Sequence, residues 1–261
     1  MPSTIVPVLV HGFLGFDRIG PLEYFRGVDR ALRSDGLSPL IPRLPPASSI
    51  AERAAALAAF LRPRSSESFV LIGHSMGGLD ARYLAANLDP DRRVKSLITV
   101  ATPHLGTPIA RRMLDGHGPL SPIGRRFWRA ALRDLTPETR RDEPIPDRPD
   151  VFYGSHAAAR PRNERPCWLA PVVGLLSEEN DGLVPLASAA WGESRETARA
   201  DHFEVVGWSL APRSRRVARP FDHIRLWRQA VSWAISSAKA KGEAKGNGNE
   251  ATRIDQERSA P

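Results

Sequence analysis

The sequence predicts a single α/β domain whose central sheet is mostly parallel and covered by helices on both faces. Apolar runs of strand length, Ile5–Val10, Phe69–Ile72 and Val94–Val100, alternate with stretches of helical periodicity. Parallel strands need long crossover connections, and helices fill those connections in folds of this class. The chain has 261 residues, 41% of them hydrophobic, which suffices for one domain with its own core.

Helices are expected between these strands. Apolar residues recur at helical spacing over Pro21–Ser34. Ser49 and Glu52 fit a capping box that opens an alanine-rich helix, and Pro63 closes it. A third helix is predicted over Met76–Leu88. These elements supply the alternation of strand and helix that a parallel sheet requires.

The second half of the chain is less regular. The alternation lapses after Gly106, and we expect residues 106–166 to form a small cap or lid insertion, with a self-packed surface loop as the alternative. Further strands are predicted over Cys167–Leu176 and Phe203–Val206, and a closing helix over Asp222–Ala238 ends the domain at residue 238. The Lys-, Gly-, Asn- and Glu-rich stretch 239–261 predicts a disordered tail.

Charge and composition narrow the possible partners. The net charge is +8, almost entirely from arginines. They are scattered along the chain, whereas nucleic-acid binders interleave basic and aromatic residues along one element. We therefore predict a solvated basic surface and no nucleic-acid partner, while contact with an anionic membrane or lipid surface stays open.

Cysteine usage and the N-terminus bear on location. Cys167 is the only cysteine, which excludes an intrachain disulfide. No apolar run approaches the ~18 residues of a membrane span, and the residues before Ile5 lack the pattern of a signal peptide. Cytoplasmic location is expected, with export by another route left open.

Gly73-His74-Ser75-Met76-Gly77 is a Gly-x-Ser-x-Gly motif placed between a predicted strand and a predicted helix. In that setting the serine occupies a sharp turn whose flanking glycines let backbone pass closely. The helix N-terminus also favours developing negative charge. We predict that Ser75 is a catalytic nucleophile; the alternative is an ordinary tight turn.

A nucleophilic serine needs a histidine base and an orienting acid, which in this arrangement follow it in the order acid, then histidine. Asp181 lies in a glycine turn after a predicted strand and is the preferred acid; Glu178 and Glu179 are the alternatives. His202 is the preferred base, and His223 is the second candidate.

The oxyanion hole requires two backbone donors. One is the amide of Met76, directly after the nucleophile. The second is expected from Phe13, in the glycine-containing loop after the first strand, where His11 has a structural role. Apolar residues expected near the mouth of the site, to receive an acyl chain, are Leu14, Phe16, Leu105, Phe127 and Trp128.

These motifs together resemble the bacterial true lipases, the Pseudomonas, Burkholderia and Proteus group of triacylglycerol lipases with the α/β-hydrolase fold. The resemblance begins at Pro7 and includes Val10-His11-Gly12-Phe13, Gly73-His74-Ser75-Met76-Gly77 and Asn180-Asp181-Gly182. The full set of matching segments is 7–17, 24–28, 31–36, 73–78, 101–108, 180–184 and 201–202.

The resemblance implies Ser75, Asp181 and His202 as catalytic triad, the amides of Phe13 and Met76 as oxyanion donors, and lipase-like ester hydrolysis without a cofactor. Many of these lipases hold a structural calcium ion, but this sequence has Glu204 where they have a ligand aspartate and Trp208 at a later ligand position. No metal site is therefore predicted.

Several alternatives fit the same motifs. A short-to-medium-chain carboxylesterase or an acyl-thioesterase would use the same catalytic groups. A catalytically silent binding module with this fold is the non-enzyme alternative, although all three triad residue types are present. Acyl chain length, alcohol moiety, physiological substrate and oligomeric state are left open.

Overall fold

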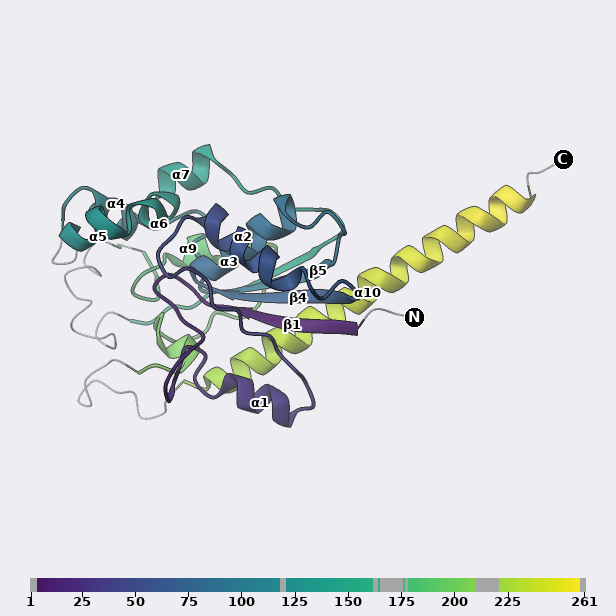
Figure 1. Cartoon of the computed structure of the whole chain (residues 1–261), viewed down its shortest axis with the longest axis horizontal. Coiled ribbons are helices and arrows are strands. Elements are labelled where there is room, and N and C mark those ends of the chain that lie inside the picture. Colours follow the sequence, from purple (N-terminus) through teal and green to yellow (C-terminus); the bar gives the residue numbers. More distant parts are fainter. Residues whose placement is uncertain are drawn as a thin grey trace.

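The computed structural model describes residues 4–117, 121–161, 164, 176, 178–209 and 221–258, with backbone only for 124 and 244–258. Five parallel strands form its main sheet in the order β1-β4-β5-β6-β7 (Figure 1). Their bounds are β1 Thr4–Val10, β4 Glu67–His74, β5 Val94–Val100, β6 Phe152–His156 and β7 Glu193–Ser194. This is the α/β architecture that the alternating pattern predicts.

Helices cover both faces of the sheet, as expected. On β4, Phe69 and Leu71 pack toward one face, against α2 (Ile50–Leu61) and α3 (Met76–Asn87). Val70 and Ile72 point to the opposite face, into the cluster that also contains residues of α1 (Val28–Ser34) and α10 (His223–Arg258). A strand buried on both faces reads as a continuous apolar run, which is how β4 appears in the sequence.

Local signals explain where the central helices begin. The Ser49 side chain accepts from the Glu52 amide and the Glu52 carboxylate accepts from the Ser49 amide, so the predicted capping box is present at α2. The helix predicted over Pro21–Ser34 is shorter: α1 begins only at Val28. Within its first half, Leu22–Glu23 forms strand β3, which pairs antiparallel with β2 (Arg18–Ile19), and Gly27 at positive φ separates this strand from the helix.

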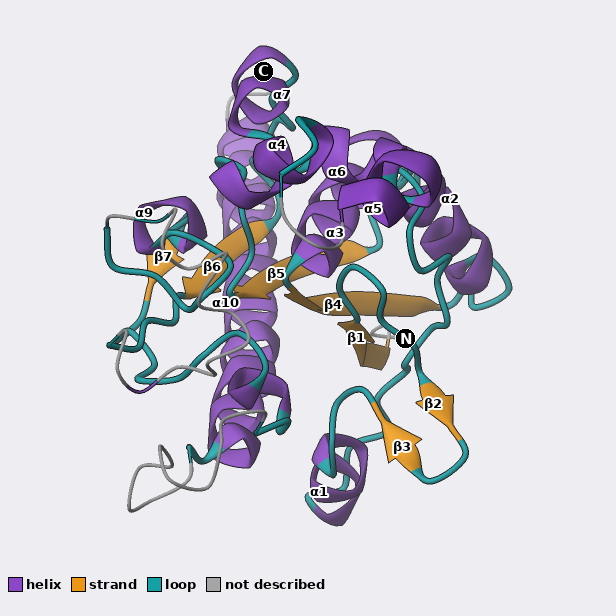
Figure 2. Ribbon diagram, turned by 90° about the vertical axis from the view of Figure 1, so that its left-hand side faces the viewer, coloured by secondary structure: helices purple, strands orange, loops and turns teal. Residues whose placement is uncertain are grey.

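The described part of the segment between β5 and β6 contains four short helices beyond the carboxyl ends of the strands (Figure 2). They are α4 (Pro108–Leu114), α5 (Ser121–Phe127), α6 (Arg129–Asp134) and α7 (Pro137–Asp142). The insertion expected over 106–166 is therefore shorter, since β6 belongs to the main sheet. The sequence Phe-Tyr-Gly-Ser-His of β6 lacks the aliphatic run that marks the other central strands.

Two further expectations near the C-terminus are corrected. Phe203–Val206 is no strand: Glu204–Val206 forms the 3-10 helix η3, which Gly207 ends at positive φ. The predicted strand Cys167–Leu176 lies outside the described residues except for the buried Leu176.

The predicted disordered tail also differs from the structure. The closing helix expected over Asp222–Ala238 continues as α10 to Arg258, and its last part projects away from the domain (Figure 1). Low apolar content shows that a segment has no face to bury, but Ala, Lys, Glu and Arg favour helix once a packed helix precedes them. Among the described residues, no helix is long and apolar enough to span a membrane.

Trp227 anchors α10 beneath the loop that carries His202. Its ring is fully buried against Phe25, and its Nε1 donates to the Val205 carbonyl at 2.7 Å. We expect Trp227→Ala to lower the free energy of unfolding by about 3–5 kcal/mol, and Trp227→Phe by less, in urea denaturation. Phe127→Ala is the matched control, because that ring is 68% exposed and should change stability by only about 0.5 kcal/mol. Equal losses for Trp227→Ala and Phe127→Ala would contradict the assignment.

Candidate functional site

Ser75 lies in the turn that connects β4 to α3, as the motif predicts. Its backbone has φ 53° and ψ −132°, a conformation that non-glycine residues rarely adopt. The turn is held on both sides: the Ser75 amide donates to the Val100 carbonyl at 3.0 Å, and Thr102 Oγ1 donates to the Ser75 carbonyl at 2.9 Å. The strain is therefore compensated by contacts with the neighbouring strand β5.

The glycines of the motif provide space for this turn. A Cβ on Gly77 would lie 2.3 Å from the Val10 carbonyl oxygen, and one on Gly73 would lie 2.5 Å from Gly78 Cα. Gly12 faces the serine from the loop after β1, where a Cβ would come within 2.8 Å of Ser75 Cβ. A side chain at Gly73 would push β4 away from the start of α3, and one at Gly77 or Gly12 would push the turn and the end of β1 apart.

His202 and Asp181 complete a hydrogen-bonded chain with Ser75. His202 Nε2 lies 3.0 Å from Ser75 Oγ, and His202 Nδ1 lies 2.6 Å from Asp181 Oδ2. Since a carboxylate only accepts, Nδ1 carries the proton and Nε2 is free to accept the serine proton. All three side chains are buried. The structure thus brings together the three residues singled out from the sequence, which lie far apart along the chain.

The alternatives for base and acid lie elsewhere. His223 Nε2 donates to the Arg26 carbonyl at 2.8 Å and lies half-buried at the start of α10. Glu178 and Glu179 are exposed, whereas Asp181 is 1% exposed. The second Asp181 oxygen, Oδ1, accepts from the amides of Leu183 and Val184 at 2.9 and 2.7 Å. These bonds orient the carboxylate toward His202.

Two backbone amides near Ser75 are available to a ligand. Met76 is the first residue of α3, where an amide has no partner within the helix. Phe13 follows Gly12, whose own amide donates to the Tyr24 hydroxyl at 3.1 Å. Within 4–117 and 178–209, neither the Met76 nor the Phe13 amide donates to another protein atom. Both amides therefore remain candidates for the two donors of an oxyanion hole.

A buried ion pair, which the sequence did not reveal, holds the Phe13 loop in place. Arg53 on α2 donates to the carbonyls of Pro45, His11 and Gly12 at 2.6, 2.7 and 3.3 Å. Its guanidinium also pairs with Asp80 on α3 at 2.8 Å, and both side chains are fully buried. Burial raises the pKa of the Asp80 carboxyl to about 7, and the Arg53 charge opposes that rise.

His11 has the structural role expected of it. Its Nδ1 donates to the Gly12 carbonyl at 3.0 Å, so its Nε2 accepts from the Leu44 amide, also at 3.0 Å. Burial lowers the pKa of His11 to about 4 and keeps the ring neutral.

The five residues expected to receive an acyl chain are differently placed. Leu14, Leu105 and Phe127 are exposed by 43%, 54% and 68%. The Trp128 ring packs edge-on against Phe13, with centroids 5.5 Å apart. Phe16 instead packs edge-on against Tyr24 at 5.9 Å. The structure therefore brings Trp128 beside the Phe13 loop and leaves Leu14, Leu105 and Phe127 open to solvent.

Charged side chains elsewhere are engaged with one another. Glu204, at the calcium-ligand position of the lipases, pairs with Arg160 at 2.8 Å, and Trp208 Nε1 donates to the Tyr24 carbonyl.

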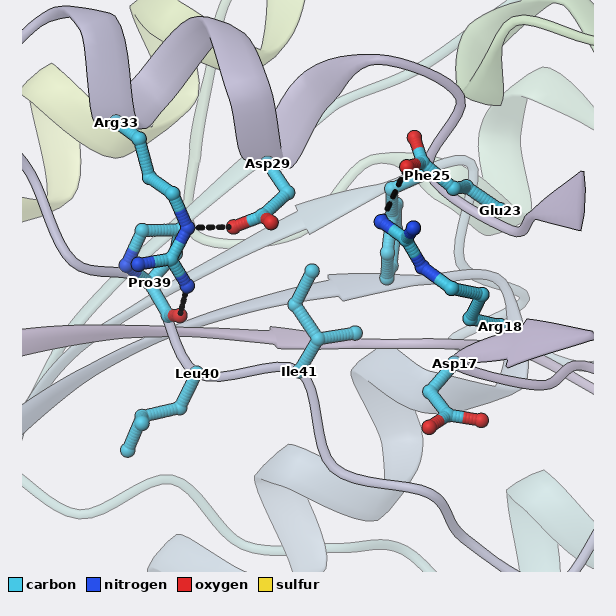
Figure 3. A pocket seen from close by; sticks show the side chains of 9 residues that line it. All are labelled: Asp17, Arg18, Glu23, Phe25, Asp29, Arg33, Pro39, Leu40 and Ile41. Atoms are coloured by element: carbon cyan, nitrogen blue, oxygen red, sulfur yellow. Dashed lines mark hydrogen bonds and ion pairs between the residues drawn. The ribbon is translucent and has the colours of Figure 1, made fainter. Parts of the chain in front are cut away.

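A pocket of about 300 Å³ lies between β3 and α1, where Arg18 pairs with Glu23, and Arg33 with Asp29 (Figure 3). No cluster of three or more metal-ligating side chains occurs among the described residues.

Comparisons with known proteins agree with this geometry. A family model described as alpha/beta hydrolase fold matches residues 8–116. Triacylglycerol lipase 2 of Saccharomyces cerevisiae is 32% identical over 205 residues, which are 72% of this chain and 63% of that protein. Triacylglycerol lipase of Pseudomonas fragi is 37% identical over 116 residues, 42% of this chain and 39% of that protein. The chain thus spans less than two thirds of these relatives.

Solved structures show the same fold. The mature lipase BlEst2 of Bacillus licheniformis matches with a TM-score of 0.65 at 21% identity, covering 79% of this chain and 88% of that one. The metagenomic carboxyl esterase MGS0156 matches with a TM-score of 0.68 at 21% identity, covering 94% of this chain and 77% of that one.

Buried histidines near the site generate a pH dependence. Burial, reinforced by the Arg195 charge, lowers the pKa of His156 to about 4. An unfolded histidine takes up a proton near pH 6.5, so the unfolded state binds more protons between pH 6.5 and 4. Stability from His156 is therefore present above pH 6.5 and lost on acidification toward pH 4.

We expect His156→Phe to reduce the decrease in the free energy of unfolding between pH 6.5 and pH 4, by up to about 1.4 kcal/mol per pH unit. Phenylalanine preserves the edge-on packing of the ring against Trp233. The measurement is urea denaturation of both proteins from pH 7 to pH 4. Parallel stability curves for the two proteins would contradict the prediction.

Proposed function

Because the chain has the α/β-hydrolase fold and is related to triacylglycerol lipases, we propose that it is a serine hydrolase of fatty-acyl esters. The observation that carries this proposal is the hydrogen-bonded chain Ser75–His202–Asp181 at 3.0 and 2.6 Å. Its substrate is an ester with an acyl chain, either a triacylglycerol or a simpler fatty-acid ester.

The reaction begins with acylation of Ser75. His202 Nε2 takes the hydroxyl proton while Ser75 Oγ attacks the ester carbonyl carbon. The oxygen that becomes negative accepts hydrogen bonds from the amides of Phe13 and Met76. His202 then gives its proton to the leaving alcohol, and an acyl-enzyme remains on Ser75.

Deacylation repeats these steps with water as the nucleophile. His202 removes a proton from water, the hydroxide attacks the acyl carbon, and Ser75 recovers its proton as the acid product leaves. Asp181 fixes the imidazole orientation and stabilises its cationic form. The Arg53 bonds to the carbonyls of His11 and Gly12 keep the Phe13 amide in position throughout.

Exposed apolar side chains favour a lipid-like substrate and contact with a lipid surface. Figure 2 looks onto the carboxyl ends of the strands, with α4–α6 on one side and the β2–β3 hairpin on the other. Ile123 and Phe127 on α5, and Ile19 and Leu22 on the hairpin, are 44–68% exposed. Scattered exposed apolar residues are common, but exposed apolar side chains on elements beyond the same end of a sheet are typical of an interaction site.

The proposed nucleophile is tested with Ser75→Ala. Wild-type protein should hydrolyse p-nitrophenyl esters and be labelled by a fluorophosphonate, whereas Ser75→Ala should lose both activities. Asp181→Asn should retain the fold and lose about 10⁴-fold in kcat, because it disturbs the histidine tautomer. Equal hydrolysis by wild type and Ser75→Ala would overturn the assignment, and absence of labelling in wild type would favour a binding module.

The proposed lipid contact is tested at α5. Phe127→Ser should weaken binding to vesicles by about tenfold, since burying a phenylalanine contributes roughly 1.5–3 kcal/mol. Labelling of Ser75 by a small fluorophosphonate should be unchanged, which makes it the internal control, because that reaction requires no bound acyl chain. Vesicles with and without anionic lipid, at two salt concentrations, separate apolar from electrostatic binding.

A chain-length panel measured below and above the solubility limit then distinguishes lipase from esterase. A rate that jumps on aggregation supports a lipase, and smooth saturation supports an esterase. Acyl-thioesters in the same panel test the thioesterase alternative.

In the vesicle experiment, unchanged binding of Phe127→Ser would contradict the proposed contact with a lipid surface.

A further inference from the structure

The segment that carries Asp181 is tied to the loop after β5 by side chains that the proposed mechanism does not use. Ser188 Oγ donates to the Gly106 carbonyl at 2.7 Å and accepts from the Leu105 amide at 3.1 Å. The Ser188 carbonyl accepts from the His104 amide at 2.9 Å. Thr107 Oγ1 donates to the Leu183 carbonyl at 2.6 Å. These four hydrogen bonds join residues 104–107 to residues 183–188.

Thr107 bonds to the same residue, Leu183, whose amide orients the Asp181 carboxylate. The amide of Leu183, whose carbonyl Thr107 binds, is one of the two donors to Asp181 Oδ1. The Asp181 amide in turn donates to the Val184 carbonyl at 3.2 Å, which closes the turn. Displacing residue 183 would therefore shift the Asp181 carboxylate relative to His202.

A rigid assembly supports the other side of this junction. The His104 ring stacks on Trp191, with centroids 5.2 Å apart, and the Arg82 guanidinium lies 3.8 Å above the same indole. Arg82 can only donate, so His104 Nδ1 accepts from it at 3.2 Å and Nε2 donates to Thr99 Oγ1 at 3.0 Å. This fixes the neutral tautomer of His104.

The assembly links four parts of the fold. Arg82 lies on α3, the helix that follows Ser75, and Thr99 lies on β5. Asp147, which follows the cap helices, accepts from Arg82 Nη2 at 3.0 Å and from Trp191 Nε1 at 2.7 Å. Trp191 follows α9 (Leu186–Ala189), the helix that contains Ser188. The helix that follows Ser75 and the segment that carries Asp181 therefore both contact the buried His104.

From this arrangement we propose that Thr107 and Ser188 are positioning residues for the proposed hydrolysis. Their hydroxyl groups hold the acid segment against the loop after β5, which keeps Asp181 within hydrogen-bond reach of His202. The inference rests on the proposed function, since positioning matters only if the triad acts. It differs from that function because neither hydroxyl touches substrate or reacting atoms.

Thr107 offers a matched pair of variants. Thr107→Ser keeps the hydroxyl and the cap of α4, whereas Thr107→Val keeps the shape and loses the bond to Leu183. We expect Thr107→Val and Ser188→Ala to lower the fluorophosphonate labelling rate and kcat by about 10- to 100-fold, because a misplacement of about 1 Å can cost 10²-fold. KM should change little, and Thr107→Ser should stay close to wild type.

Thr136→Val controls for lost stability. Thr136 is another buried threonine whose hydroxyl caps a short helix, α7, and it bonds to the Arg133 carbonyl and to Thr139. This variant should match Thr107→Val in the loss of Tm while labelling at the wild-type rate. Equal slowing in Thr136→Val and Thr107→Val would overturn the proposal, because it would reduce the effect to general destabilisation.

Hydrogen exchange of the peptide 178–189 gives a readout independent of activity. Its amides should exchange faster in Thr107→Val and Ser188→Ala than in wild type and Thr107→Ser. Unchanged exchange and unchanged labelling in both variants would overturn the proposal. Wild-type protein that neither labels nor hydrolyses esters would refute the proposed function, and exchange would still decide whether these hydroxyls order the acid segment.

Discussion

The strained turn at Ser75 is the constraint on which the rest of the site depends. A serine at φ 53° directs its side chain out of the end of β4, but only while the surrounding backbone can come close. That closeness requires glycine at 73 and 77, the carbonyl of Val100 beside the Ser75 amide, and the Thr102 hydroxyl on its carbonyl. The turn is therefore a product of the parallel pairing of β4 with β1 and β5 as much as of the motif itself.

The buried pair of Arg53 and Asp80 constrains the Phe13 loop in a similar way. Removing both charges from water is costly, and replacing such a pair by apolar residues is often neutral or stabilising elsewhere. Here the guanidinium also satisfies carbonyls of Pro45, His11 and Gly12, which apolar residues could not do. Because α2 and α3 supply one partner each, the position of the Phe13 amide is coupled to the helix that begins after Ser75.

Short-range patterns in the sequence predict only part of this structure. The apolar runs of β1, β4 and β5, the capping box at Ser49 and the chain order of Ser75, Asp181 and His202 are all local or ordinal signals. β6 is not predictable in this way, because its Gly154 and Ser155 lack an apolar pattern and it becomes a strand by pairing with β5. Nor is the role of Arg53, one arginine among many, because it depends on carbonyls distant in sequence. The helix from residue 239 onward differs from the predicted disordered tail, since composition reports missing core contacts rather than helix propensity.

The order of Asp181 and His202 along the chain does not by itself bring their side chains within hydrogen-bond distance. Asp181 and His202 lie on separate loops, and loops alone hold side chains less accurately than strands or helices do. In this structure both loops are fixed from outside: Thr107 and Ser188 bind the acid segment, and Trp227 binds the Val205 carbonyl just after His202. A further backbone bond, from the His202 amide to the Asp181 carbonyl at 2.9 Å, joins the loops directly. The 2.6 Å contact between His202 Nδ1 and Asp181 Oδ2 is thus set by packing against β5, α9 and α10. The sequence predicts the identities of the two residues but not this geometry.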